Sequence, residues 1–172
     1  MSHLLYEIET VPGGKIDQPP PGYRWEVFRP SLLRVHPSGT PRYFAVWWLM
    51  HHARVFRNRD FHVVMMKHGD KVVHYSLVSP DYYRFPFMAD RDLTVGDSWT
   101  DPAHRGKGLY TYVLKRVAAK FHRPGRKIWT IHAEGNEGSR KSFTRAGYQY
   151  VGDVERTKRF GLRLLGQYRR PR

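Results

Sequence analysis

The stretch that determines the fold runs from residue 93 to residue 121 and reads LTVGDSWTDPAHRGKGLYTYVLKRVAAKF. Residues 93–100 are typical of a β-strand, and residues 104–121 predict an amphipathic helix because their large apolar side chains fall on one stripe. Arg105-Gly106-Lys107-Gly108 lies between them. Amide N–H groups at the front of a helix carry partial positive charge, and glycine lets an anion approach the backbone closely. The stretch therefore predicts a site for a phosphate or diphosphate, with added charge from Arg105 and Lys107.

The spacing of these glycines excludes two common nucleotide-binding loops. The sequence contains no Gly-x-x-x-x-Gly-Lys-Ser/Thr motif, which the P-loop requires. It also lacks a Gly-x-Gly-x-x-Gly motif with an acidic residue about twenty positions further on, which marks dinucleotide-binding folds. The predicted anion site therefore belongs to another class of fold.

The rest of the chain predicts a sheet around this stretch. Strands are expected at 23–28, 61–66, 72–78, 127–133 and 148–154, and helices at 40–56 and 136–146. The order of these elements favours an α/β fold, in which a mixed central sheet has helices on both faces. Residues 1–22 are expected to be a lead-in rich in Pro and Gly, and residues 23–172 a single domain that ends in a basic tail.

Composition narrows the choice of partners. The 172 residues include 30 Lys and Arg against 15 Asp and Glu, and this formal net charge of +15 favours nucleic acid, an anionic membrane surface or a phosphorylated small molecule. The absence of cysteine excludes disulfides, a thiol nucleophile and a Cys-ligated zinc, and the histidines lack metal-ligand spacing, so no metal is expected. The longest apolar run, residues 44–50, is too short to span a bilayer, and no secretory signal is visible. We therefore expect a soluble cytoplasmic protein.

Two motifs resemble those of the GNAT N-acetyltransferase superfamily. Its core motif, Arg/Gln-x-x-Gly-x-Gly/Ala between a strand and a helix, is matched by Arg105-Gly106-Lys107-Gly108-Leu109-Tyr110, which departs from it at Tyr110. Its second motif has an Asn, a small residue three positions later and a helix that ends in Gly-aromatic. Asn136, Ser139 and Gly147-Tyr148 match that motif. The resemblance extends from about residue 60 to residue 155, and more loosely from Tyr23.

The resemblance implies both a fold and a co-substrate. The fold is a mostly antiparallel central sheet in which the two central strands splay apart as a V. Acetyl-CoA, or another acyl-CoA, lies in that gap, with its pantetheine arm along one strand and its diphosphate on the glycine-rich turn. The residues expected to bind it are Ser98, Trp99, Thr100, Arg105, Gly106, Lys107, Gly108, Leu109, Tyr110, Asn136 and Ser139. For Asn136 and Ser139, helix capping is the alternative role.

The reaction that the resemblance implies, acyl transfer to an amine, needs a base. An alkyl amine with a pKa near ~10 is mostly protonated at neutral pH, so a side chain or a water has to take its proton. Asp97 is the first candidate, because alternation along residues 93–99 places it on an otherwise apolar face. Pairing with an arginine explains that carboxylate equally well. His132 and Glu134, at the end of the next strand, are the second candidates.

An acid that protonates the leaving thiolate is harder to assign. The family often supplies a tyrosine seven positions after the Asn of the second motif, but this position is Phe143, which has no proton to donate. The remaining candidates are Tyr148, Tyr110, Ser142 and a water, and departure of the thiolate without an acid is a further alternative.

Three functions from different classes follow. The first is an N-acyltransferase that moves an acetyl or similar acyl group onto a primary amine of a small molecule, with an amino sugar of a surface-polysaccharide pathway as one candidate. Trp47 and the aromatic stretch 80–88 are expected to shape its acceptor pocket. The second is an acyl-CoA-binding sensor without turnover, an alternative that the departures at Phe143 and Tyr110 leave open. The third is a nucleic-acid-binding protein, which is disfavoured because the basic residues are spread out and no nucleic-acid-binding motif is present. A homodimer is left open.

Overall fold

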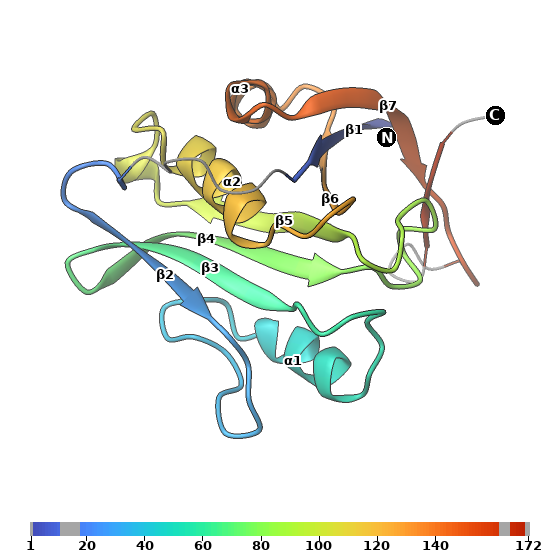
Figure 1. Cartoon of the computed structure of the whole chain (residues 1–172), viewed down its shortest axis with the longest axis horizontal. Coiled ribbons are helices and arrows are strands. Elements are labelled where there is room, and N and C mark those ends of the chain that lie inside the picture. Colours follow the sequence, from blue (N-terminus) through green and yellow to red (C-terminus); the bar gives the residue numbers. More distant parts are fainter. Residues whose placement is uncertain (1, 11–17, 162–165, 171–172) are drawn as a thin grey trace.

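A computed structural model describes residues 2–10, 18–161 and 166–170. They form one eight-stranded sheet, in the order β2-β3-β4-β5-β6-β1-β7-β8, together with three α-helices (Figure 1). The strands are β1 (Ser2–Glu9), β2 (Tyr23–Phe28), β3 (His62–His68), β4 (Lys71–Pro80), β5 (Leu93–Thr100), β6 (Lys127–Ala133), β7 (Gln149–Arg156) and β8 (Tyr168–Arg169). The helices are α1 (Phe44–His52), α2 (Leu109–Lys120) and α3 (Glu137–Ala146). Among the described residues, no helix is long and apolar enough to cross a membrane.

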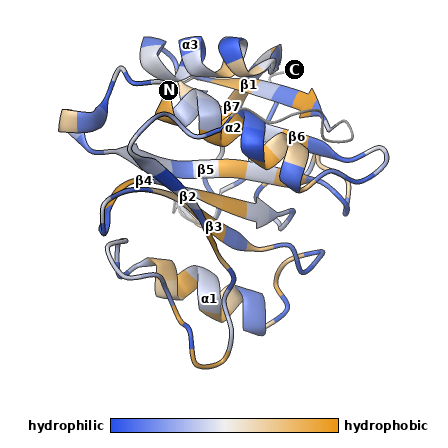
Figure 2. Ribbon diagram, turned by 60° about the vertical axis from the view of Figure 1, so that its left-hand side comes forward, coloured by the Kyte–Doolittle hydropathy of each residue, from blue (hydrophilic) through white to orange (hydrophobic). Residues whose placement is uncertain are grey.

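The sheet separates two hydrophobic layers, because successive side chains of a strand point to opposite faces. Val64 of β3 packs in the layer that contains Val113 of α2 and Phe143 of α3. Its neighbour Val63 packs in the other layer, with Phe44 of α1. Figure 2 shows the sheet between α1 on one side and α2 and α3 on the other. The predicted mixed sheet with helices on both faces is confirmed.

The neighbouring strands are antiparallel except for β5 and β6, which run parallel. These two strands pair only where residues 93–94 meet residues 128–129, and then they separate. Asp92 holds the paired end together, since its carboxylate accepts hydrogen bonds from the amide of Lys127 (3.0 Å) and from the indole of Trp129 (2.9 Å). The expected V between the central strands is therefore present, closed near Asp92 and open toward the far end of β5.

A β-bulge interrupts β5 where the V opens. Two residues of β5, Asp97 and Ser98, lie opposite a single residue of β4, Ser76. Asp97 has a φ of 45°, in the left-handed region. The extra residue reverses the alternation, so that Leu93 and Val95 face α2 whereas Asp97 faces the opposite side of the sheet. The prediction from simple alternation along residues 93–99 is therefore wrong for Asp97.

The N-terminal segment has a different role from the one expected. Residues 2–9, which the sequence places in a lead-in, form strand β1 in the interior of the sheet, between β6 and β7. In Figure 1 this blue strand lies among the orange and red strands of the second half of the chain. The expectation is wrong for this segment, because its backbone pairs along both edges, with β6 from residue 3 and with β7 from residue 2.

Two further boundaries differ from prediction. Helix α1 starts after Tyr43 rather than at residue 40, because the hydroxyl of Thr40 donates to the carbonyl of Pro37 (2.7 Å) instead of capping a helix. In the basic tail, β8 pairs with β7, so part of the tail belongs to the sheet. Residues 162–165 and 171–172 of that tail lie outside the described residues.

Candidate functional site

A cleft of about 560 Å³ opens between the splayed end of β5, the front of α2 and the first turns of α3. It gathers most of the residues that the sequence motifs assign to the co-substrate, from residues 98–110 and from the start of α3. The predicted residues that line it are Ser98, Trp99, Thr100, Arg105, Gly106, Gly108, Leu109, Tyr110, Asn136 and Ser139. Lys107 does not line the cleft, and its side chain is exposed to solvent.

The glycine-rich turn leaves the front of α2 open to this cleft. A short 3-10 turn at Pro102–His104 comes first, and Gly106 and Gly108 follow with φ angles of 75° and 73°. An α-helix cannot contain such residues, so α2 begins at Leu109 and not at residue 104 as predicted. A Cβ added at either glycine would meet no atom within 4 Å. An anion can therefore reach the amides of the first helical turn, which have no partner within the helix.

Cationic side chains border the cleft. Arg105 is held beside it, since its Nε donates to the carbonyl oxygen of Thr100 at 3.1 Å. Lys141 and Arg145 reach it from α3, where they lie one turn apart, and neither was among the predicted residues. The available signal was their spacing of four on the helix that follows Asn136, because side chains four apart share a face. Positive charge around an open helix front suits a ligand that carries phosphate groups.

Asn136 combines the two roles that the sequence leaves open. Its side-chain oxygen accepts a hydrogen bond from the amide of Ser139 at 3.1 Å, which makes it the N-cap of α3. The same residue lines the cleft. At the other end of α3, Gly147 adopts the left-handed conformation expected of a C-cap.

The far end of β5 presents an unpaired edge to the cleft. Trp99 and Thr100 pair with β4 on one side, whereas β6 has already diverged on the other. Within the described part of the chain, the backbone groups on the β6 side of these residues therefore have no strand partner. Such an edge suits an extended ligand that hydrogen-bonds to the backbone as a strand does.

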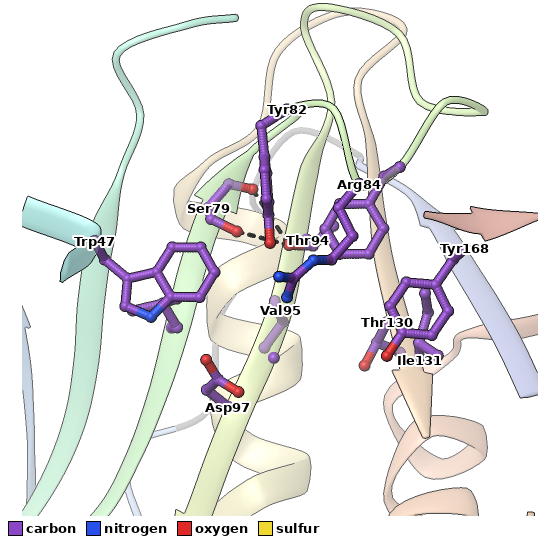
Figure 3. A pocket seen from close by; sticks show the side chains of 13 residues that line it. Trp47, Ser79, Tyr82, Arg84, Thr94, Val95, Asp97, Thr130, Ile131 and Tyr168 are labelled. Atoms are coloured by element: carbon purple, nitrogen blue, oxygen red, sulfur yellow. Dashed lines mark hydrogen bonds between the residues drawn. The ribbon is translucent and has the colours of Figure 1, made fainter. Parts of the chain in front are cut away.

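A second cavity, of about 140 Å³, lies on the opposite face of β5 (Figure 3). Its walls are aromatic, and hydroxyl and charged groups reach into it. The aromatic residues are Trp47, Tyr82, Phe85 and Tyr168, and the polar ones are Ser79, Arg84, Thr94, Asp97 and Thr130. Trp47 and part of the aromatic stretch 80–88 thus line one cavity, and we call it the aromatic pocket. Nothing in the sequence linked Tyr168 or Thr130 to it.

Asp97 stands at the mouth of the aromatic pocket, exposed to solvent, and the guanidinium of Arg84 lies near it (Figure 3). Partial removal from water raises the pKa of Asp97 above its usual range, and the positive charge of Arg84 offsets part of that rise. A carboxylate with a raised pKa is a stronger proton acceptor near neutral pH than an ordinary aspartate. The bulge thus brings a candidate base into the pocket.

Of the other candidates for proton transfer, Tyr110 and Ser142 line the cleft, whereas His132, Glu134 and Tyr148 line neither cavity. His132 is buried against Phe143 and hydrogen-bonds through Nδ1 to the carbonyl of Ala133 at 2.8 Å. Glu134 is exposed, just beyond the end of β6. Tyr148 is buried, and burial raises its pKa well above the usual value. The hydroxyl of Tyr148 has no hydrogen-bond partner among the described residues.

Comparisons with known proteins agree with this geometry. Among solved structures, a GCN5-related N-acetyltransferase from Sphaerobacter thermophilus is similar, with a TM-score of 0.61 and 16% identity over 88% of this chain and 49% of that chain. An acetyltransferase of the GNAT family from Colwellia psychrerythraea has a TM-score of 0.56 and 13% identity over 87% of this chain and 53% of that chain. At these identities the likeness establishes the fold, and the chain spans about half the length of these two proteins.

The comparison with family models is more informative than the one with solved structures. No curated protein matches the chain significantly. The family model described as acetyltransferase (GNAT) family, however, matches residues 23–148. The matched range includes β5, the glycine-rich turn, α2 and α3, which are the elements that form the cleft. The chain therefore belongs to the GNAT acetyltransferase family.

Proposed function

We propose that the protein transfers an acetyl or similar acyl group from acyl-CoA to a primary amine of a small molecule. One observation carries the proposal: consecutive residues of β5 line two cavities on opposite faces of the sheet. Ser98, Trp99 and Thr100 line the cationic cleft, and residues 94–97 line the aromatic pocket. An acyl thioester held along the end of β5 would therefore lie next to the carboxylate of Asp97.

The cleft suits CoA in shape and in charge. The open front of α2 and the side chains of Arg105, Lys141 and Arg145 would hold the phosphate groups. The unpaired edge of β5 would bind the amide groups of the pantetheine arm. These assignments give the predicted residues one shared role, the binding of the co-substrate.

The chemistry requires a proton acceptor on the side of the amine. The ammonium group loses one proton to Asp97, and the neutral nitrogen attacks the carbonyl carbon of the thioester. The C–S bond then breaks, the sulfur keeps the electron pair, and the nitrogen gives its second proton to water to leave a neutral amide. The thiolate takes up one proton from water, and Asp97 returns its proton to solvent. The net reaction converts an ammonium ion and acyl-CoA into an amide, CoA thiol and one released proton.

The aromatic pocket suggests which amines are accepted. Flat aromatic walls and several hydroxyl groups around a small cavity suit a compact polar ring with hydroxyl groups. An amino sugar has that chemistry, and the positive charge of Arg84 and of the whole chain favours one that carries a phosphate. We therefore propose an amino sugar as the acceptor class.

The proposal is tested first by binding and then by turnover. Acetyl-CoA and CoA should each raise the melting temperature at ordinary salt, whereas a short oligonucleotide should not. Release of CoA thiol from acetyl-CoA should then be measured against a panel of amino sugars, amino acids and alkyl amines. Stabilisation by the oligonucleotide alone would contradict the proposal. Binding of CoA without thiol release for any amine would favour a sensor.

A further inference from the structure

Exposed apolar side chains gather in one segment of the chain, which contains helix α1 and the loop before it. Eleven large apolar residues are exposed among the described residues, and seven of them lie between residues 32 and 55. They are Leu32, Leu33, Val35, Tyr43, Val46, Leu49 and Val55. Figure 1 shows the loop and α1 together at the lower edge of the molecule. Apolar groups that gather on one side of a domain mark a site of interaction.

Two leucines occupy the tip of the loop. The backbones of Ser31 and Arg34 pair across a tight turn, with N···O distances of 3.3 and 3.1 Å. Leu32 and Leu33 lie between them, with 75% and 95% of their surface exposed. The turn is fixed against α1, since the indole of Trp48 donates to the carbonyl of Ser31 at 2.8 Å. Hydrogen bonds therefore hold the turn in a shape that directs both leucines into solvent.

Helix α1 adds a second apolar surface. Its nine residues, Phe44–His52, include no Asp, Glu, Lys or Arg, so it lacks the charged face that a helix at the surface usually turns to water. Phe44 packs in the core layer on this side of the sheet. Val46 and Leu49 are three positions apart, share a face and are more than half exposed. A helix that is apolar on its outer face as well is expected to be covered there.

The charged residues around these apolar groups have one sign. Residues 29–59 contain six arginines and no Asp or Glu, which gives this segment +6 of the formal charge of +15. All six are exposed, and they are Arg29, Arg34, Arg42, Arg54, Arg57 and Arg59. Among the described residues, only Arg57 of the six lies within 4.0 Å of a carboxylate, at Asp81 and Asp90. The protein therefore supplies few counter-charges for this segment.

Apolar and positive groups together narrow the choice of partner. A second copy of this chain would bring one surface of charge +6 against another, and like charges across an interface oppose association. A nucleic acid would bind the arginines but would give the leucines of the turn no apolar partner. A bilayer surface with anionic phospholipids satisfies both, because apolar side chains insert among the headgroups while basic side chains meet the lipid phosphates.

We propose that the exposed side chains of residues 29–59, which we call the α1 face, bind the surface of a membrane that contains anionic phospholipids. Leu32 and Leu33 at the turn and the outer side of α1 insert among the headgroups. The surrounding arginines bind the lipid phosphates. The inference is independent of the proposed function, because the exposed apolar residues of the α1 face line neither the cleft nor the aromatic pocket.

The first test measures binding to vesicles. The full chain is sedimented with vesicles of phosphatidylcholine, and with vesicles that mix phosphatidylcholine and phosphatidylglycerol in equal parts. Binding to the anionic vesicles should be about 100-fold tighter, because several arginines lie within reach of the lipid phosphates. This binding should weaken as the salt concentration rises. Binding to neither kind of vesicle, or equal binding to both, would overturn the inference.

Substitution of the turn separates insertion from attraction between charges. The double variant Leu32→Ser, Leu33→Ser keeps every charge, and it should lower the partition coefficient onto anionic vesicles about tenfold, because the apolar tip is lost. Both leucines are exposed, so the melting temperature and its rise with CoA should match wild type. Unchanged vesicle binding in this variant would overturn the inference.

A matched pair of charge changes separates the α1 face from the net charge of the chain. Arg29→Gln with Arg42→Gln should lower the partition coefficient about tenfold. Lys115→Gln with Lys120→Gln removes the same two charges from exposed positions of α2, on the other side of the sheet, and should lower it less than about twofold. Equal losses in the two double variants would mean that only the net charge matters, and would overturn the inference.

A dye on a single cysteine shows which part of the molecule inserts. The chain has no cysteine, so a dye that reports polarity labels only the one that is introduced. On Leu33→Cys its emission should move to shorter wavelength with anionic vesicles, whereas on Lys115→Cys it should not. Equal shifts at both positions, or none at Leu33→Cys, would overturn the inference. Sedimentation without vesicles tests the other occupant: a wild-type dimer that Leu32→Ser, Leu33→Ser dissociates would place a second copy on this face.

Discussion

The cleft beside α2 and the aromatic pocket beside α1 share strand β5 but differ in how the sequence encodes them. The cleft is formed mainly by one continuous stretch, residues 98–111, with α3 added from nearby in the chain. The aromatic pocket draws on Trp47, Arg84 and Tyr168, which meet only in the folded chain. One short segment of the sequence can encode a backbone site for a common group such as a diphosphate, whereas a pocket for a particular acceptor depends on distant segments.

The substitution with the largest expected effect prevents CoA binding in the cleft and leaves the aromatic pocket intact. Gly108→Glu would place a carboxylate where the diphosphate is expected, and like charges in contact cost several kcal/mol. We expect the affinity for CoA to fall about 1000-fold, measured by calorimetry. Gly69→Glu is the matched control, because Gly69 also has a positive φ with open space around it but lies in the β3–β4 turn. An equal loss of affinity in both variants would mean that the change acts through the fold.

The substitution with the next largest effect removes the proposed base from the aromatic pocket and leaves the cleft intact. Asp97→Asn should lower kcat about 100-fold, because the amide cannot accept the proton of the amine, and CoA affinity should stay near that of wild type. In wild type, activity should fall as the pH drops through the raised pKa of Asp97, since protonation removes the base. Asp97→Asn should lose this acidic limb, as measured by thiol release across pH. If the acidic limb of the pH profile were unchanged in Asp97→Asn, another group would be responsible for it.

A smaller effect concerns the recognition of the acceptor. Trp47→Ala removes one wall of the aromatic pocket and should raise the KM for the acceptor about tenfold, with the KM for acetyl-CoA unchanged. Trp48→Ala is the control on the same helix, because Trp48 is absent from the pocket wall and its indole donates to the carbonyl of Ser31 instead. Equal effects of the two changes would indicate a general loss of α1 packing.

The smallest effect separates Asp97 from a second acid near the pocket. Burial raises the pKa of Asp81 to about 6, and one of its carboxylate oxygens is buried without a hydrogen-bond partner among the described residues. Because this folded pKa lies above the usual value, protonation stabilises the fold at low pH, and that stabilisation is lost between about pH 4 and pH 6. Asp81→Asn should therefore raise the free energy of unfolding at pH 7 by about 1 kcal/mol, and less at pH 4.

The rate of thiol release by the Asp81→Asn variant completes this test. Asp81 lines neither cavity, so thiol release should match wild type. Urea unfolding at the two pH values measures the change in stability. A loss of activity in Asp81→Asn comparable to that of Asp97→Asn would mean that the pocket holds a different base.

The elements that the sequence predicted best are those that local chemistry defines. Strand 127–133 and helix α3 with its caps follow from side-chain pattern and from Asn136 and Gly147. The bulge at Asp97 could not be predicted this way, because it is a relation between β5 and the register of β4. Strand β1 carried a usable signal, since Tyr6 and Ile8 alternate with glutamates, but its burial depends on partners more than 100 residues away.

The same difference applies to the candidate site. All residues predicted from the sequence to bind the co-substrate line the cleft except Lys107, whose side chain is exposed to solvent. The hydrogen bonds of His74 to the hydroxyls of Ser76 and Thr100 left no mark in the sequence, because His74 and Ser76 belong to a strand whose pattern shows only that it is buried. Their chemistry depends on which hydroxyls the neighbouring elements bring to them.

The position of β1 has a consequence for how the molecule folds. This strand is synthesised before every other part of the sheet, yet both strands that flank it lie between residues 127 and 156. Its main-chain groups must wait for most of the chain to leave the ribosome before they are paired. Closure of the sheet around β1 is therefore expected late in folding, and pairings between segments so distant in the chain are slow to form. Until then, its apolar side chains are available to chaperones and to aggregation.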